Sequence, residues 1–240
     1  MPNYSCTVSS VTPLNHNVYR VILSMEEGIP LSFKPGQYLE IIHSDNERSA
    51  FSIAQCPRQD AEIELQILRD PNQGTSVAVL SYLQNHSMVQ ITAPQGSCTL
   101  DNTSDDQPII IGAASTGFAQ AKSLLEGAFT AQLPQPIRLY WGVRQARDYY
   151  QLEMIDRWRQ QWPQFDCIQV VAEDSTWAGR SGLLNQVLLE DLPQWRDCHL
   201  YLSGSPAMVY ACVDLLAENQ LFNHGNTYSD VFTYAPRTEK

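Results

Sequence analysis

The stretch Ile109-Ile110-Ile111-Gly112-Ala113-Ala114-Ser115-Thr116-Gly117-Phe118 indicates the fold of the second half of the chain. Its apolar start predicts a buried strand, and the small residues that follow predict a turn into a helix. Small side chains allow a pyrophosphate or a nicotinamide to approach the backbone, and the first turn of a helix offers free amide groups. An ordinary tight strand–helix turn also favours Gly, Ser and Thr, so this stretch alone leaves both interpretations open.

Strand and helix patterns alternate from this stretch to the end of the chain. The expected strands are 108–112, 137–142, 165–172, 199–204 and 228–234, and the expected helices are 118–130, 152–162, 182–189 and 207–219. Continuous apolar strands between helices predict a doubly wound α/β domain, with a parallel sheet that is covered on both faces. Ligands of such a domain bind at the carboxyl ends of its strands.

The first hundred residues have a different pattern, in which short strands predominate. The expected strands are 4–11, 18–23, 37–42, 50–54, 62–67 and 88–93, with one helix over 75–83. The clearest alternation of polar and apolar residues is Glu62-Ile63-Glu64-Leu65-Gln66-Ile67. Six short strands at this spacing predict a small antiparallel β-barrel. We therefore expect a barrel domain over 1–100 and an α/β domain over 101–240, with polar residues 101–107 as a linker or as a loop before a strand.

Composition excludes several classes of protein. The chain has 240 residues and a formal net charge of −11, and a surface this acidic repels nucleic acid. No secretory signal opens the chain and its apolar runs are too short to span a membrane, so a cytoplasmic location is expected. The six cysteines and five histidines are dispersed. Their spacing predicts reduced thiols, no iron–sulfur cluster and no metal site.

Other motifs of the second half also fall at the predicted ends of strands. Gly204-Ser205-Pro206-Ala207-Met208 follows one strand; Ser205 could cap the next helix and Pro206 suits its first turn. Tyr140-Trp141-Gly142-Val143-Arg144 ends another strand, and Arg144 and Arg147 would place cations where a dinucleotide phosphate or ribose could lie. Glu173 and Asp174 end a third, where an acidic side chain can accept a ribose hydroxyl and favours NADH over NADPH.

In the first half, Arg48-Ser49-Ala50-Phe51-Ser52-Ile53-Ala54 is the main candidate for ligand binding. The Ser52 hydroxyl could form a hydrogen bond with a ring nitrogen of an isoalloxazine, and Phe51 could shield one face of that ring. An ordinary strand that alternates polar and apolar residues and binds no ligand would have the same sequence pattern. The turn Phe33-Lys34-Pro35-Gly36-Gln37-Tyr38 just before it is interpreted as structural.

Taken in order, these motifs resemble those of the ferredoxin–NADP reductase-like superfamily over nearly the whole chain. The set is Phe33-x-Pro35-Gly36-Gln37-Tyr38, Arg48…Phe51-Ser52, Gly74-Thr75-Ser76, Thr116-Gly117-Phe118, Trp141-Gly142-x-Arg144 and Gly204-Ser205-Pro206-x-Met208. Within the superfamily, three stretches are similar to the short bacterial NAD(P)H:flavin oxidoreductases, including those that supply luciferase with reduced flavin. They are Leu139–Gly142, Trp177–Gly182 and Tyr228-Ser229-Asp230-Val231-Phe232.

The resemblance implies a flavin-binding barrel and a nicotinamide-binding α/β domain, with the two rings stacked between them. It implies that Ser52 and Thr116 are the catalytic residues, the first near flavin N5 and the second near the nicotinamide. The residues expected to bind the flavin or the nucleotide are Arg48, Ala50, Phe51, Ser52, Gly74, Thr75, Ser76, Gly112, Ser115, Thr116, Gly117, Gly142, Arg144, Gly204, Ser205, Pro206, Met208 and Phe232. Residues 74–76 match the place where members that retain a flavin hold its phosphate.

The chain departs from the family pattern at three places. The family usually has Arg two residues before the aromatic, where this chain has Ser49; either a bulge restores the Arg48 contact or the contact is lost. The family's Gly-Gly-Thr-Gly turn is Ala114-Ser115-Thr116-Gly117 here, which would crowd the nicotinamide or require an unusual φ. Ser203 stands where many members have Cys, and the flavin reductases also lack Cys there.

The expected reaction is direct hydride transfer from nicotinamide C4 to flavin N5, with NADH or NADPH as donor and FMN, FAD or riboflavin as acceptor. The flavin could be a bound cofactor or a dissociable substrate whose reduced form serves a monooxygenase or ferric iron. Two alternatives stay open. One is a flavoprotein subunit that passes electrons to a protein partner, and the other is a non-catalytic nucleotide-binding module.

Overall fold

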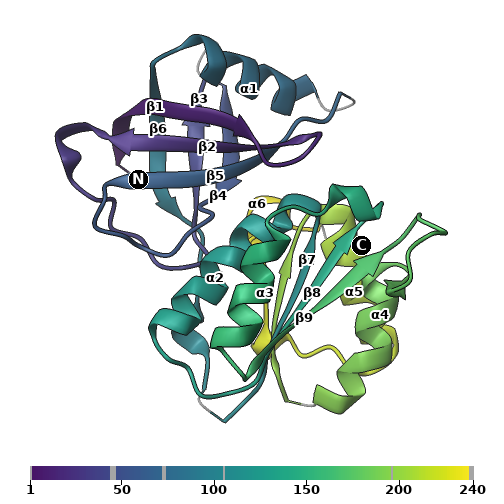
Figure 1. Cartoon of the computed structure of the whole chain (residues 1–240). Coiled ribbons are helices and arrows are strands. Elements are labelled where there is room, and N and C mark those ends of the chain that lie inside the picture. Colours follow the sequence, from purple (N-terminus) through teal and green to yellow (C-terminus); the bar gives the residue numbers. More distant parts are fainter. Residues whose placement is uncertain (1, 44–46, 72–73, 105, 196, 238–240) are drawn as a thin grey trace.

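The computed structural model describes residues 2–43, 47–71, 74–104, 106–195 and 197–237 of the chain. Two six-stranded sheets follow one another along the sequence, one antiparallel and one parallel (Figure 1). The antiparallel sheet ends with β6 (Met88–Gln95) and the parallel sheet begins with β7 (Ile109–Ala114). The predicted fold class, a β-barrel followed by a doubly wound α/β domain, is confirmed, whereas the boundary at residue 100 stays a prediction.

The antiparallel sheet forms the barrel. It consists of β1 (Asn3–Pro13), β2 (Val18–Met25), β3 (Tyr38–Ile42), β4 (Arg48–Ser52), β5 (Glu62–Leu68) and β6, in the order β4-β3-β6-β1-β2-β5. A bridge between Ile53 and Leu65 joins the two outer strands and closes the barrel. Helix α1 (Gly74–Asn85) caps it, with Val79, Leu80 and Leu83 buried in the barrel core.

The parallel sheet has the order β10-β9-β8-β7-β11-β12. Its strands are β7, β8 (Ile137–Val143), β9 (Phe165–Val171), β10 (Arg180–Ser181), β11 (His199–Ser203) and β12 (Thr227–Tyr228). The chain runs outward from β7 to β10 and then returns to the other side of β7 with β11. The direction of winding therefore reverses between β7 and β11, and a doubly wound sheet binds its ligand at such a point.

Helices cover both faces of the parallel sheet because successive strand residues point to opposite sides. Ile109 and Ile111 face α2 (Phe118–Thr130) and α3 (Leu152–Gln161), whereas Ile110 faces α4 (Leu184–Asp191) and α5 (Pro206–Glu218). The two cores are thus layers on either side of one sheet. Among the described residues, no helix is long and apolar enough to cross a membrane.

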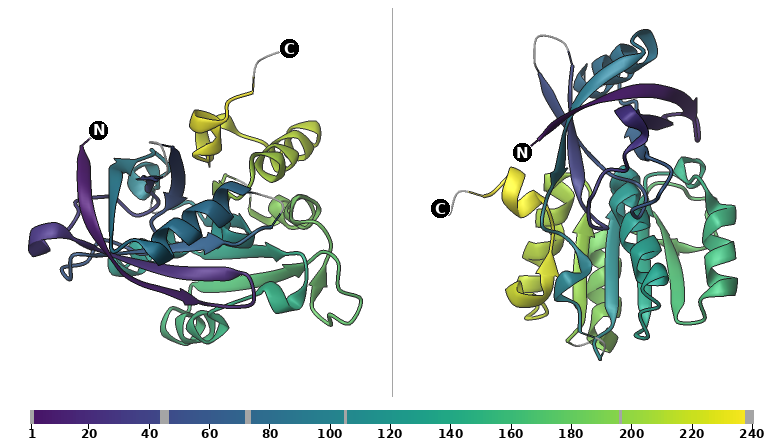
Figure 2. Two further views of the ribbon diagram at one scale, coloured as in Figure 1. Left: turned by 90° about the horizontal axis from the view of Figure 1, so that it is seen from above. Right: turned by 90° about the vertical axis from the view of Figure 1, so that its left-hand side faces the viewer.

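The predicted final strand over 228–234 is wrong. Only Thr227–Tyr228 is a strand, and the chain then turns into α6 (Val231–Tyr234), a single helical turn. The turn forms because the Asp230 carbonyl accepts hydrogen bonds from the backbone N–H groups of Thr233 and Tyr234. Figure 2 shows this C-terminal segment, in yellow, beside α5.

Candidate functional site

A cavity of about 520 Å³ lies between the barrel and the carboxyl ends of the parallel strands. Its volume is typical of sites for small ligands. The barrel, the turns after β7 and β11, and the C-terminal segment all contribute to its walls. The lining residues are Tyr38, Ala50, Phe51, Ser52, Gln66, Leu68, Ser76, Ala114, Ser115, Thr116, Gly117, Ala119, Gln120, Leu202, Ser203, Gly204, Ser205, Ser229, Asp230, Val231 and Tyr234.

The barrel wall of the cavity is built on β4. Phe51 is partly buried against the barrel core, so its ring is held in place. Ser52 pairs with Tyr38 of β3, which brings an aromatic residue beside its side chain. No described residue forms a hydrogen bond with the Ser52 hydroxyl, which lines the cavity and is available to a ligand.

The α/β wall is a tight turn that follows β7. Ser115 adopts a φ of +51°, a left-handed conformation that costs a non-glycine residue energy. Its carbonyl oxygen accepts a hydrogen bond from Trp141 Nε1 at 3.1 Å, which stabilises the turn. The unusual φ expected of this Ala-Ser sequence is therefore present, and the fold holds it by an indole donor from the neighbouring strand.

The turn after β7 packs directly on the turn after β11. A Cβ atom built on Gly117 would lie 2.2 Å from the Ser203 carbonyl oxygen, so only glycine fits at this position. Ser205 caps α5 by accepting a hydrogen bond from the Met208 amide at 3.3 Å, and Pro206 occupies the first turn, as predicted. The starts of α2 and α5 thus meet at one wall of the cavity, where their partial positive charge favours an anionic ligand group.

Asp230 joins three parts of the molecule at the cavity. One carboxylate oxygen accepts a hydrogen bond from Gln120 Nε2 of α2 at 2.6 Å. The other accepts from the backbone amides of Ser97 and Cys98, which follow β6, at 3.3 and 3.4 Å. Burial raises the pKa of the Asp230 carboxyl above its usual range, and these hydrogen bonds oppose the shift.

The C-terminal segment is attached to α5. The Arg237 guanidinium pairs with both carboxylate oxygens of Asp214 and lies over the Tyr210 ring, 4.1 Å from its centroid. The Tyr210 hydroxyl donates a hydrogen bond to the Ala235 carbonyl at 2.9 Å. These contacts hold Tyr234, which is 51% exposed, at the mouth of the cavity.

Half of the residues predicted to bind ligands line this cavity. They are Ala50, Phe51, Ser52, Ser76, Ser115, Thr116, Gly117, Gly204 and Ser205. The remaining nine do not line it: Arg48, Gly74, Thr75, Gly112, Gly142, Arg144, Pro206, Met208 and Phe232. Several of these support it from behind; Met208, for example, is 2.5 Å from where a Cβ atom of Gly204 would stand. Phe232 packs beside Tyr210 of α5.

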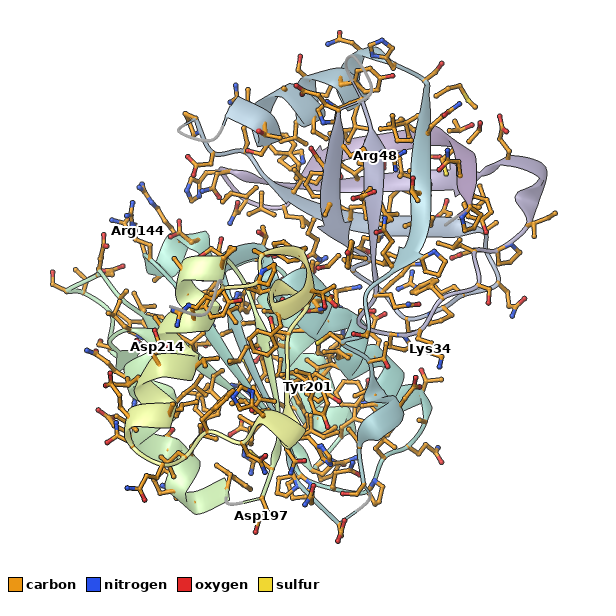
Figure 3. The ribbon with its side chains drawn as sticks, turned by 180° about the vertical axis from the view of Figure 1, so that it is seen from behind. Lys34, Arg48, Arg144, Asp197, Tyr201 and Asp214 are labelled. Carbon is orange, nitrogen blue, oxygen red and sulfur yellow. The ribbon has the colours of Figure 1, made fainter. Side chains whose placement is uncertain are left out.

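Arg48 points away from the cavity. Its guanidinium donates hydrogen bonds to Thr92 Oγ1 at 2.8 Å and to Glu40 at 3.2 Å on neighbouring barrel strands. The pairing of β4 with β3 is regular, so no bulge restores the family contact. Figure 3 shows Arg48 among the barrel strands, well separated from Arg144 at the edge of the parallel sheet. Ser49, at the family's arginine position, is buried and forms a hydrogen bond with His43 Nε2.

Arg144 and Glu173 form an ion pair at the carboxyl ends of β8 and β9. Arg144 Nε lies 3.2 Å from a Glu173 carboxylate oxygen, and both side chains are exposed. The edge where a nucleotide ribose was expected therefore presents one cation and one anion that are already paired with each other. The pair uses Arg144 Nε and one Glu173 oxygen, so the remaining guanidinium donors and the second carboxylate oxygen stay open to a ligand.

Twelve of the lining residues were not predicted as binding residues, and Asp230, Gln120 and Tyr234 show why. Asp230 lies inside the quoted stretch 228–232, but its role depends on amides far away in the sequence. Gln120 is in the first turn of α2, and no local pattern marks it as a binding residue. Tyr234 falls in the segment that was predicted to be a strand.

Comparison with known proteins agrees with this geometry. Residues 112–214 match the family model of the oxidoreductase NAD-binding domain. The ferredoxin–NAD(P)(+) reductase component of the naphthalene 1,2-dioxygenase/salicylate 5-hydroxylase systems of Ralstonia is 32% identical, over 94% of this chain and 68% of that protein. The NAD(P)H-flavin reductase of Aliivibrio fischeri is 28% identical, over 96% and 98%. The Amycolatopsis cytochrome P450 reductase GcoB superposes with a TM-score of 0.84 at 26% identity, over 95% and 68%.

The fold, the cavity between its two parts and these matches define an oxidoreductase with an NAD-binding domain. The chain belongs to the ferredoxin–NADP reductase-like superfamily, whose cofactors are a flavin and a reduced nicotinamide nucleotide. This assignment argues against the non-catalytic module that the sequence left open.

The residues of the cavity fit the ring system and the sugar-alcohol chain of a flavin. Phe51, Tyr38 and Tyr234 supply aromatic surface, and Ser52 supplies a hydroxyl without a partner among the described residues. No Lys or Arg is among the described residues that line the cavity. A flavin phosphate would therefore meet no cation in the cavity wall.

Proposed function

We propose that this chain is an NAD(P)H-dependent flavin reductase that takes free flavin as a substrate and releases it reduced. The cavity carries this proposal. It is lined by Phe51 and Ser52, which are expected to bind the flavin, and by the turn 115–117, which is expected to bind the nicotinamide. When bound, the flavin supplies the hydride acceptor. The protein brings the two rings together and excludes water from between them.

The role of each wall follows from its groups. Ser52 donates its hydroxyl hydrogen bond to the ring edge, and Phe51 limits the ring to one orientation. Thr116 orients the nicotinamide. It lies in the turn after β7, which can pack on the turn after β11 because Gly117 has no side chain. The first turns of α2 and α5 favour the pyrophosphate. No acid or base is needed for the hydride step itself.

The wall without cations supports flavin as a dissociable substrate. A hydrogen bond between a charged group and a phosphate contributes about 1.5–3 kcal/mol. Without such a bond, the site recognises the ring and the sugar-alcohol chain, so riboflavin, FMN and FAD would all be accepted. The reduced product could then serve a monooxygenase or ferric iron.

A second candidate is a flavoprotein component that passes electrons to a protein partner. The Ralstonia relative is named as the reductase component of a dioxygenase system, and GcoB is named a cytochrome P450 reductase. This candidate predicts one flavin per chain after purification.

The two candidates are separated by flavin content and by turnover. Protein purified without added flavin is assayed for bound flavin, and then for NADH and NADPH oxidation with and without riboflavin, FMN or FAD. The flavin reductase is supported by little bound flavin and by turnover that increases with added flavin. Stoichiometric flavin and turnover that depends on a protein acceptor would support the second candidate.

A further inference from the structure

Asp230 is the single charged residue among the described residues that line the cavity. Its side chain is 7% exposed and accepts three hydrogen bonds, all from neutral donors. Neither of two cations on nearby elements compensates it. Lys122 of α2 pairs with Glu126 at 2.8 Å, and Arg48 binds Glu40 and Thr92.

The surroundings of the carboxylate are otherwise neutral or anionic. The titratable groups that act on it or on its neighbours are Tyr38, Tyr234 and Cys98, and none of them is a cation at neutral pH. Desolvation raises the pKa of Asp230, as expected for a carboxylate without a counter-ion. The first turn of α2, which contains Gln120, brings only the partial positive charge of a helix start to the carboxylate.

The proposed reaction changes the charge of the flavin in this cavity. NAD(P)H gives two electrons and one proton, as a hydride, to the neutral oxidised flavin. The products are NAD(P)⁺ and a reduced flavin that carries one negative charge until it takes a proton from water. An anion that forms beside a buried carboxylate is repelled, because the protein interior screens charges less than water does.

We propose that Asp230 makes the cavity bind reduced flavin more weakly than oxidised flavin and so drives release of the product. This inference rests on the proposed function, in which flavin is a substrate. It assigns Asp230 a role in product release, and Gln120 the role of positioning the carboxylate. The hydride step does not use Asp230.

The test measures binding and needs no turnover. Riboflavin is the probe, because it lacks a phosphate, and its oxidised and chemically reduced forms are titrated anaerobically into the protein at about pH 8, where free reduced flavin and a carboxylate are ionised. The wild-type protein is expected to bind the reduced form about tenfold more weakly, the order of one like charge at this range. For a two-electron couple, tenfold corresponds to a midpoint potential about 30 mV below that of free riboflavin.

Asp230→Asn removes the charge and keeps the shape of the side chain. The two dissociation constants are then expected to become equal within about threefold, whereas Asp230→Glu keeps the wild-type ratio. The proposal is overturned if the wild-type protein binds reduced riboflavin as tightly as the oxidised form, a result that needs no variant to fold. It is also overturned if a folded Asp230→Asn protein keeps the wild-type ratio. Failure of oxidised riboflavin to bind at all would instead overturn the proposed function.

Discussion

The Lys122 ammonium of α2 lies 3.7 Å from Glu64 Oε1 of β5, and both side chains are 3% exposed. This ion pair is buried where the α/β part of the chain meets the barrel. Lys122 also donates a hydrogen bond to the Ala54 carbonyl of the barrel at 2.5 Å and pairs with Glu126 at 2.8 Å. The two walls of the cavity are therefore joined by a charged group that has lost its water and depends on its partners.

We expect Lys122→Met to lower the free energy of unfolding by about 3 kcal/mol, because the buried Glu64 and the partly buried Glu126 lose their shared cation. Urea denaturation measures the change. Lys34→Met is the control: Lys34 pairs with Asp101 at 2.6 Å, but both are more than half exposed, so its loss should cost less than about 1 kcal/mol. If both variants lose the same free energy of unfolding, the Lys122–Glu64 ion pair does not stabilise the contact between the barrel and the α/β part of the chain.

Ser52→Ala is expected to lower kcat for flavin reduction about tenfold, the effect of one lost hydrogen bond in the transition state. The KM for NADH should change little, because Ser52 lies on the barrel wall. Steady-state kinetics with riboflavin measure both parameters. Ser49→Ala on the same strand is the control, since Ser49 binds His43 and does not line the cavity. A Ser52→Ala enzyme with unchanged kcat would remove Ser52 from the mechanism.

Gly117→Ala is expected to destabilise the chain by more than about 2 kcal/mol and to raise the KM for NADH. The added Cβ atom would lie 2.2 Å from the Ser203 carbonyl oxygen, so the two turns that bind the nucleotide must separate. Thermal unfolding and kinetics check the two effects. Gly74→Ala is the control for stability, because no atom lies within 4 Å of its added Cβ. A Gly117→Ala protein as stable as this control would show that the turns do not pack as described.

Riboflavin and FMN are expected to have KM values within about tenfold of each other, because no Lys or Arg is among the described residues of the cavity wall to form a charge-assisted hydrogen bond with the phosphate. For the same reason Arg48→Ala should leave their ratio unchanged, since Arg48 binds Glu40 and Thr92 instead. The measurement is the kinetics of both flavins with wild-type and variant protein. A strong preference for FMN that Arg48→Ala abolishes would show that Arg48 reaches the ligand.

The stability of the fold is expected to fall in weak acid because of His199. Its Nε2 accepts a hydrogen bond from the Ser104 amide at 3.0 Å, which requires the neutral ring, and burial lowers its pKa below 6.5. The unfolded chain then binds the proton more readily than the folded chain. The stability that depends on neutral His199 is present above pH 6.5 and is lost as the pH falls through the lowered pKa.

Urea denaturation over a range of pH checks this expectation. His199→Asn should flatten the fall in stability toward acid, whereas the same change at the exposed His224 should not. If the two variants and the wild-type protein keep the same pH dependence, His199 does not control it.

Much of the fold could be predicted from local patterns. Residues 118–130 are a helix as expected, and every strand expected before residue 205 is present within a few residues. These elements have a strong hydrophobic period, and burial on one or two faces follows from it. The strand predicted over 228–234 was wrong. Its Val, Phe and Tyr residues favour strands, but the hydrogen bonds that the Asp230 carbonyl accepts turn the chain into a helix.

The site could be predicted only in part because it depends on what covers each surface. Glu64 and Gln66 occupy the polar positions of an alternating strand, which predicts exposure, yet the α/β part of the chain buries both. The direction of Arg48 depends on the register between β4 and β3, which the sequence does not specify. Asp230 meets its partners only after the whole chain has folded.

In the proposed function, the cavity brings a reduced nicotinamide nucleotide and a free flavin together. The most direct measurement follows the ultraviolet absorbance of NADH or NADPH with purified protein, with and without riboflavin, FMN or FAD. We expect the nucleotide to be oxidised only when flavin is present, and more slowly by Ser52→Ala. Folded protein that binds flavin but oxidises neither nucleotide with any of the three flavins would contradict it.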